Sequence, residues 1–168
     1  MVLVTGTHHA TPLVEFQYRT DRTVSLMGEK TTEAALRFAE EKTARECGFL
    51  LVDATVYPDT EDIRYVFIME IDRVSADLTE QEVLCRLEKN LATANPSLGD
   101  KLDKGLVNHT KILFAQPETF MLYREVMLAK GASIAQLKPV TVICNEFQKK
   151  YFFFLTDTFE EIKMACEG

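Results

Sequence analysis

Residues 49–72, FLLVDATVYPDTEDIRYVFIMEID, decide the fold that we expect for this chain. The stretch contains two β-rich runs, Phe49–Tyr57 and Ile63–Asp72, and the turn residues Pro58-Asp59-Thr60 separate them. In the second run the residues alternate between two faces. One face carries Ile63, Tyr65, Phe67, Met69 and Ile71, and the other carries Arg64, Glu70 and Asp72. The two runs therefore predict neighbouring antiparallel strands.

Helix signals flank these strands on both sides in the sequence. One predicted helix has Thr31 or Thr32 as its N-cap and ends at Gly48, a residue that favours helix termination. A second begins with Thr79-Glu80-Gln81-Glu82, which has the spacing of a capping box, and ends at Asn95-Pro96. Helices on either side of the strands indicate a layered domain.

The rest of the chain adds shorter elements. After residue 96 we predict one short helix before His109 and a strand at Lys111–Ala115. A helix with Pro117 near its first position follows and stops at Gly131. The last predicted elements are a strand at Val140–Cys144, an apolar strand-sized segment at Lys150–Leu155 and a helix at Thr158–Cys166. Residues 1–28 contain three short β-rich runs. The order predicts an α+β fold, an open mixed β-sheet with helices packed against it, preceded by a small β-meander.

Composition excludes several classes of protein. The chain has 168 residues, 46% of them hydrophobic, which suits one globular domain. Its net charge of −7 argues against a general nucleic-acid partner, since phosphate contacts need a basic face. No run approaches the roughly 20 apolar residues of a membrane span, so we expect no membrane partner. Four widely spaced cysteines without a CxxC pair, and an N-terminus without a signal peptide, predict a cytoplasmic location.

Candidate site residues are few when judged from the residues alone. The chain has no Walker loop, no GxGxxG and no nucleophile triad, and its three histidines lack metal-ligand spacing, so we predict no metal site. Lys30 lies at a strand-to-helix junction, where a helix N-terminus favours anions. Lys138 closes the loop that starts at Gly131. By spacing alone, each could equally be an ordinary surface lysine.

Two motifs contain these lysines and resemble a known family. Val4-Thr5-Gly6, Pro12 and Glu29-Lys30-Thr31-Thr32-Glu33 resemble the VTGF–(x)–P–(x)–DKTxE passage of the plant auxin-responsive acyl acid amido synthetases. Residues 131–138, GASIAQLK, are similar to that family's GASINQYK, with Leu137 in place of its tyrosine. The resemblance covers about residues 1–144. This sequence lacks the family's Ser/Thr-rich phosphate loop and its YRxGD segment.

The resemblance implies a function and a domain organisation. These enzymes belong to the acyl-adenylate-forming superfamily that includes firefly luciferase, and they adenylate a carboxylic acid with ATP and Mg²⁺ before conjugating it to an amino acid. By this resemblance, residues 1–28 are strands after the interdomain hinge and residues 29–168 are the mobile C-terminal lid. Lys138 would be catalytic in adenylation, and Lys30 would bind the nucleotide phosphate.

The partner implied in this way is a missing N-terminal adenylation domain, through which the carboxylic acid and the amino acid would bind. We expect the chain to be part of a longer ATP-dependent ligase, inactive and without bound ATP by itself. The alternative is a stand-alone, non-catalytic binding or regulatory module of the same fold. A third interpretation is a protein that pairs through an exposed sheet edge, with Phe152, Phe153 and Phe154 as its contact surface.

Overall fold

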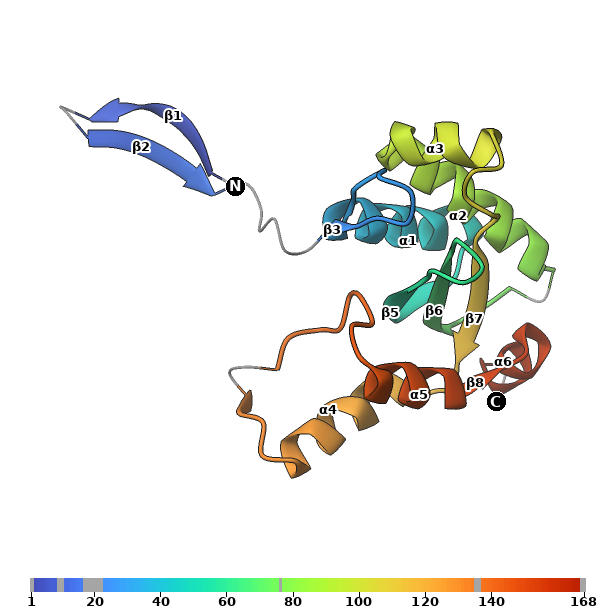
Figure 1. Ribbon diagram of the computed structural model, residues 1–168. Coiled ribbons are helices and arrows are strands. Elements are labelled where there is room, and N and C mark those ends of the chain that lie inside the picture. The colour runs from blue at the N-terminus through green and yellow to red at the C-terminus, as the bar shows by residue number, and fades with distance from the viewer. Residues whose placement is uncertain (1, 9–10, 17–22, 76, 135–136, 167–168) are drawn as a thin grey trace.

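The computed structural model describes residues 2–8, 11–16, 23–75, 77–134 and 137–166 (Figure 1). Its amino-terminal part contains two small antiparallel sheets. Strands β1 (Val2–His8) and β2 (Thr11–Phe16) form a hairpin, and β3 (Thr23–Val24) pairs with β4 (Thr31–Thr32). The third β-rich run therefore pairs with the residues just before the first helix and not with the hairpin.

The main sheet has four strands in the order β5-β6-β7-β8. These are β5 (Leu50–Asp59), β6 (Arg64–Asp72), β7 (Lys111–Ala115) and β8 (Thr156–Asp157). The β5–β6 and β7–β8 pairs are antiparallel, whereas β6 and β7 are parallel and are joined through helices. The predicted antiparallel pair and the predicted α+β class with a mixed sheet are confirmed.

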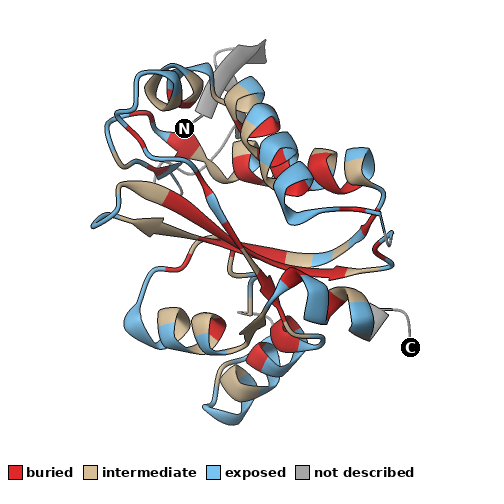
Figure 2. Cartoon of the chain, turned by 90° about the vertical axis from the view of Figure 1, so that its right-hand side faces the viewer, coloured by how far each residue is buried: buried red, intermediate tan, exposed pale blue. Residues whose placement is uncertain are grey.

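Helices cover both faces of this sheet (Figures 1 and 2). Three helices pack on one face: α1 (Glu33–Cys47), α2 (Glu80–Ala94) and α3 (Pro96–Asp103). Two helices pack on the other face: α4 (Thr119–Ala129) and α5 (Glu146–Phe154). The last helix, α6 (Phe159–Cys166), lies beside β7. Strand β6 is consequently buried on both faces. Its Phe67 and Met69 belong to the core with α1 and α2, and Ile68 belongs to the core with α4 and α5.

Local capping signals place the helix ends as predicted. The Thr32 hydroxyl oxygen accepts the Ala35 N–H at 3.2 Å, and Gly48 ends α1 with a φ of 73°. Thr79 and Glu82 form the predicted capping box at the start of α2, and Asn95 ends that helix.

The start of α4 differs from the prediction. Pro117 lies before the helix, and Glu118 is the N-cap residue, with a φ of 68° and no side-chain capping bond. A side chain from β6 supplies the cap instead. The Glu70 carboxylate, which is buried, accepts the Glu118 N–H at 2.8 Å and the Phe120 N–H at 3.1 Å.

The predicted strand at Val140–Cys144 and the apolar segment at Lys150–Leu155 have other structures. Val140–Cys144 is not a strand, because only Val142 forms a bridge, to Val56 of β5. Residues 150–154 belong to helix α5, whose N-cap is Asn145. In a helix, the three consecutive phenylalanines point in different directions: Phe152 is buried, Phe153 is half-buried and Phe154 is 83% exposed. The interpretation in which they contact a partner at a sheet edge is therefore wrong.

Candidate functional site

Lys138 lies beside a cleft between the start of α1 and helix α4. The cleft has a volume of about 410 Å³. Thr23, Val24 and Glu33 line it from β3 and the start of α1, and Tyr123 and Met127 line it from α4. Its remaining wall is the segment 137–144, which carries Lys138, together with Gln148 of α5. The lining of the cleft therefore comes from elements that are more than 100 residues apart in the sequence.

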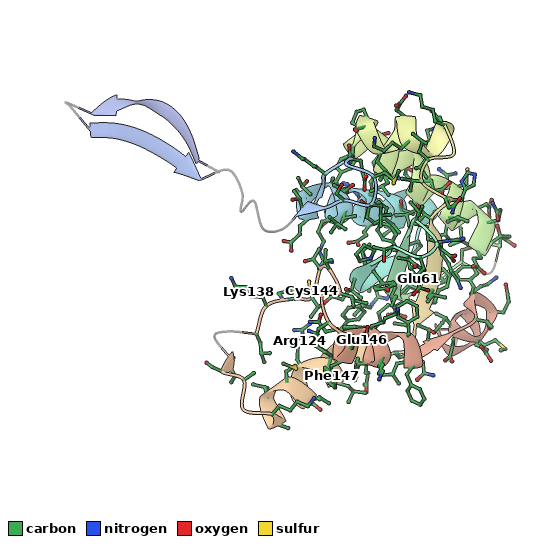
Figure 3. All side chains as sticks on the ribbon, in the orientation of Figure 1. Glu61, Arg124, Lys138, Cys144, Glu146 and Phe147 are labelled. Atoms are coloured by element: carbon green, nitrogen blue, oxygen red, sulfur yellow. The ribbon has the colours of Figure 1, made fainter. Side chains whose placement is uncertain are left out.

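The Lys138 side chain is exposed at this cleft (Figure 3). The residues that the structure describes offer it no hydrogen bond and no ion pair. Pro139 follows it directly and disfavours helical backbone at Lys138, and residues 137–140 belong to neither a helix nor a strand. An ammonium group in this position can contact an anion that approaches the cleft.

Hydrogen bonds to the sheet and to α4 fix the segment after Lys138. The Val56 N–H donates to the Thr141 carbonyl at 3.0 Å, and the Ile143 N–H donates to the Val56 carbonyl at 2.9 Å. Farther along, the Cys144 N–H donates to the Gln148 side-chain oxygen at 2.8 Å, and the Gln148 amide nitrogen lies 3.2 Å from the Tyr123 hydroxyl. The wall of the cleft is thus tied to β5 and to α4.

Sequence reasoning missed Gln148 and Tyr123 as residues of this site. Our interpretation of 140–144 as a strand, followed by an apolar segment, left no reason for them to meet. The available signal was the spacing of Asn145 and Gln148, an N-cap residue followed three positions later by glutamine. The Asn145 side chain does accept the Gln148 N–H, at 2.9 Å.

Lys30 has a different setting, in the loop between β3 and β4. Its side chain is exposed, and it is not among the described residues that line the cleft of Lys138. Its backbone has a φ of 50°, in the left-handed region that side-chain-bearing residues seldom adopt. Such a conformation persists only where the surrounding structure imposes it.

A buried carboxylate next to Lys30 organises this loop. Glu29 is only 4% exposed, and its carboxylate accepts the N–H groups of Leu26 and Met27, each at 2.7 Å. The Tyr65 hydroxyl, from β6, donates a third hydrogen bond to the same carboxylate. The loop therefore closes around the Glu29 side chain and is attached to the central strand of the sheet.

Hydrogen bonding keeps Glu29 ionised although it is buried. Burial alone would raise its pKa, but the bonds from Tyr65, Leu26 and Met27 outweigh burial and hold the pKa below its ordinary value of 4.5. Burial, and the adjacent carboxylate, raise the pKa of Tyr65 above its ordinary value. At neutral pH the pair is therefore a carboxylate and a neutral phenol.

Among the described residues, His, Cys, Asp and Glu side chains form no group of three that could hold a metal ion. The described helices include none with the length and apolar content needed to cross a bilayer.

Known proteins provide a comparison for this arrangement. The family described as "GH3 family C-terminal domain" matches residues 30–146. Indole-3-acetic acid-amido synthetase GH3.4 of Arabidopsis thaliana is 28% identical over 144 residues, and GH3.8 of Oryza sativa subsp. indica, with the same description, is 29% identical over 144 residues. In each case the match covers 80% of this chain and 24% of the relative, so the chain spans about a quarter of their length.

Solved structures share the fold. A GH3.15 acyl acid amido synthetase matches with a TM-score of 0.74 and 19% identity, over 94% of this chain and 30% of that chain. A complex of AtGH3.15 with 2,4-DB matches with a TM-score of 0.70. The family match covers most of this sequence, and it includes both Lys30 and Lys138. The chain therefore belongs to the GH3 family, as a C-terminal domain of the acyl acid amido synthetases.

Proposed function

We propose that this chain is the mobile C-terminal lid of an ATP-dependent acyl acid amido synthetase. The whole protein would adenylate a carboxylic acid and then conjugate the acyl group to an amino acid. Family membership supports this, as does the chain's coverage of only 24% of each curated relative. An N-terminal adenylation domain would be its partner and would bind both substrates. Residues 1–28 would follow the hinge, and the family match, which starts at residue 30, supports a boundary there.

Lys138 would be catalytic in the adenylation step. When a carboxylate attacks the α-phosphorus of ATP, negative charge builds up on the phosphoryl oxygens, and an ammonium group at that point stabilises the transition state. The observation that carries this proposal is the exposed Lys138 side chain at the cleft, on a segment bonded to β5, with no ion pair among the described residues. A lid that swings would deliver this charge only in its closed position.

Lys30 would contact a phosphate of the bound nucleotide. Its exposed side chain precedes α1 by three positions, and helix N-termini carry partial positive charge. Mg²⁺ would arrive with ATP, because this ion usually binds through substrate phosphates and one or two carboxylates. The chain by itself would bind ATP weakly or not at all, because the proposed partner domain supplies most of the nucleotide site.

ATP–pyrophosphate exchange in the protein purified from its source tests this proposal. We expect Lys138→Ala to lower the exchange rate by a factor of about 10²–10³, as removal of a transition-state donor does. Lys30→Ala should mainly weaken the use of ATP. The matched control is Lys150→Ala, since Lys150 is an exposed lysine of α5 that does not line the cleft. An unchanged exchange rate in Lys138→Ala would show that the role assigned to Lys138 is wrong.

The size of the native protein separates this proposal from the alternative. An immunoblot of source cells with an antibody to this chain should give a band several times larger than 19.1 kDa. A band at 19.1 kDa would favour the stand-alone module and would remove the catalytic roles of both lysines. Because the cysteine pattern suits a reducing compartment, we also propose a cytoplasmic location, and fractionation of the same cells tests it.

A further inference from the structure

The loop that carries Lys30 is attached to the core on both sides of that residue. From this geometry we infer that Glu29 and Tyr65 are positioning residues, which hold Lys30 where it can meet a phosphate. The inference rests on the proposed contact between Lys30 and the nucleotide. Neither Glu29 nor Tyr65 would touch the nucleotide, because both are buried, with exposed fractions of 4% and 1%.

On the amino-terminal side, the Glu29 side chain fixes the path of the loop. Its two carboxylate oxygens accept the backbone N–H groups of Leu26 and Met27, so the chain has to turn between residues 26 and 29. Gly28 makes this turn with a φ of 85°. The Tyr65 hydroxyl donates to the same carboxylate from a strand that is buried on both faces. The turn is thereby fixed relative to the sheet.

On the carboxyl-terminal side, Thr31 is held by the same group of residues. Thr31 is fully buried, and its hydroxyl oxygen lies 3.1 Å from the Tyr65 hydroxyl oxygen. The Asn95 side-chain nitrogen donates to the Thr31 hydroxyl at 3.0 Å and to the Glu29 carbonyl at 3.2 Å. Lys30 is thus an exposed residue between two buried neighbours, and hydrogen bonds hold both of those neighbours.

This arrangement explains the left-handed backbone at Lys30. With Glu29 and Thr31 both turned inward, the residue between them takes a φ of 50° and directs its side chain to solvent. The contact that the Lys30 N–H makes with the Ser25 hydroxyl is long, at 3.5 Å. The position of the ammonium group therefore depends on the hydrogen bonds of its neighbours. If the Tyr65 hydroxyl is removed, the carboxylate loses its attachment to the sheet while the ring remains in the core.

The test is steady-state exchange kinetics in the native protein, with thermal melting of each variant. We expect Tyr65→Phe and Glu29→Gln each to raise the KM for ATP about tenfold, because the loss of one hydrogen bond from a charged group weakens binding by about this factor. In a Lys30→Ala background neither substitution should raise KM further, since the group they position is already absent. The control is Tyr57→Phe, which removes a hydroxyl that bonds to Lys149 and should leave KM unchanged.

The outcomes separate this inference from the proposed function. A KM for ATP that rises in Lys30→Ala but not in Tyr65→Phe or Glu29→Gln would overturn the positioning role alone. A KM that does not change in Lys30→Ala would overturn the proposed nucleotide contact and the positioning role with it. An effect of Tyr65→Phe that persists undiminished in the Lys30→Ala background would show a purely structural role, and would also overturn the inference.

Discussion

A buried carboxylate in α1 makes the stability of this domain depend on pH. The Glu40 side chain is fully buried, and within the described ranges one of its oxygens has no hydrogen-bond partner. Arg37 lies 3.4 Å from the other oxygen. Burial dominates and raises the pKa of Glu40 from 4.5 to about 8, although the Arg37 charge lowers it in part. Glu40 is therefore protonated in the folded state at neutral pH.

The sign of the effect follows from proton binding. Between pH 4.5 and 8 the unfolded chain loses the Glu40 proton while the folded chain keeps it, so the free energy of unfolding falls as pH rises. The loss is about 1.4 kcal/mol for each pH unit, or about 5 kcal/mol over the whole window. Below pH 4.5 both states are protonated, and above pH 8 both are ionised, so the contribution is constant there.

Glu40→Gln removes this titration and nearly keeps the shape of the side chain. We expect the variant and the unsubstituted protein to differ little in pH dependence below pH 4.5. Above pH 4.5 the free energy of unfolding of the variant should rise steadily relative to that of the unsubstituted protein, and the difference should reach about 3 kcal/mol at pH 7. Urea unfolding followed by circular dichroism at pH 5, 6, 7 and 8 measures the difference. Glu41→Gln, at the exposed next position, is the matched control. Parallel curves for Glu40→Gln and the unsubstituted protein would refute the reasoning.

Further substitutions probe the fold and the stability of the domain at acidic pH. Glu70→Ala leaves two N–H groups at the start of α4 without their acceptor and should cost about 2 kcal/mol in urea unfolding. Phe152→Ala empties a fully buried position and should cost about 3–5 kcal/mol, whereas an exposed Phe154→Ala should cost little. Gly48→Ala places a side chain at a φ of 73° and should lower stability by about 1 kcal/mol. Glu29→Gln should weaken the fall in the free energy of unfolding below pH 4.5, because the lowered pKa of Glu29 gives stability above pH 4.5 that is lost as pH falls. The same fall in the variant and in the unsubstituted protein would contradict this.

Local signals in the sequence determined much of the fold. The ends of α1 and α2 follow from Thr32, Gly48 and the pair Thr79 and Glu82, because a cap is made by residues within a few positions of one another. Alternation in residues 63–72 predicted β6 and its partner β5, because one apolar face must be buried. The two lysine motifs identified the family, and the family match includes both lysines, Lys30 and Lys138.

Only the tertiary structure decided the rest. An aromatic run such as residues 151–155 suits a strand or a helix equally, and the core of Phe120, Tyr123 and Ile68 selects the helix. Glu70 appears in the sequence as a polar residue on the face opposite the apolar one, yet it caps a helix that starts 49 residues later. The bonds of Glu29 to Tyr65 and of Asn95 to Thr31 join residues 36 and 64 positions apart. Contacts at such separations depend on how sheet and helices pack, which local sequence patterns do not specify.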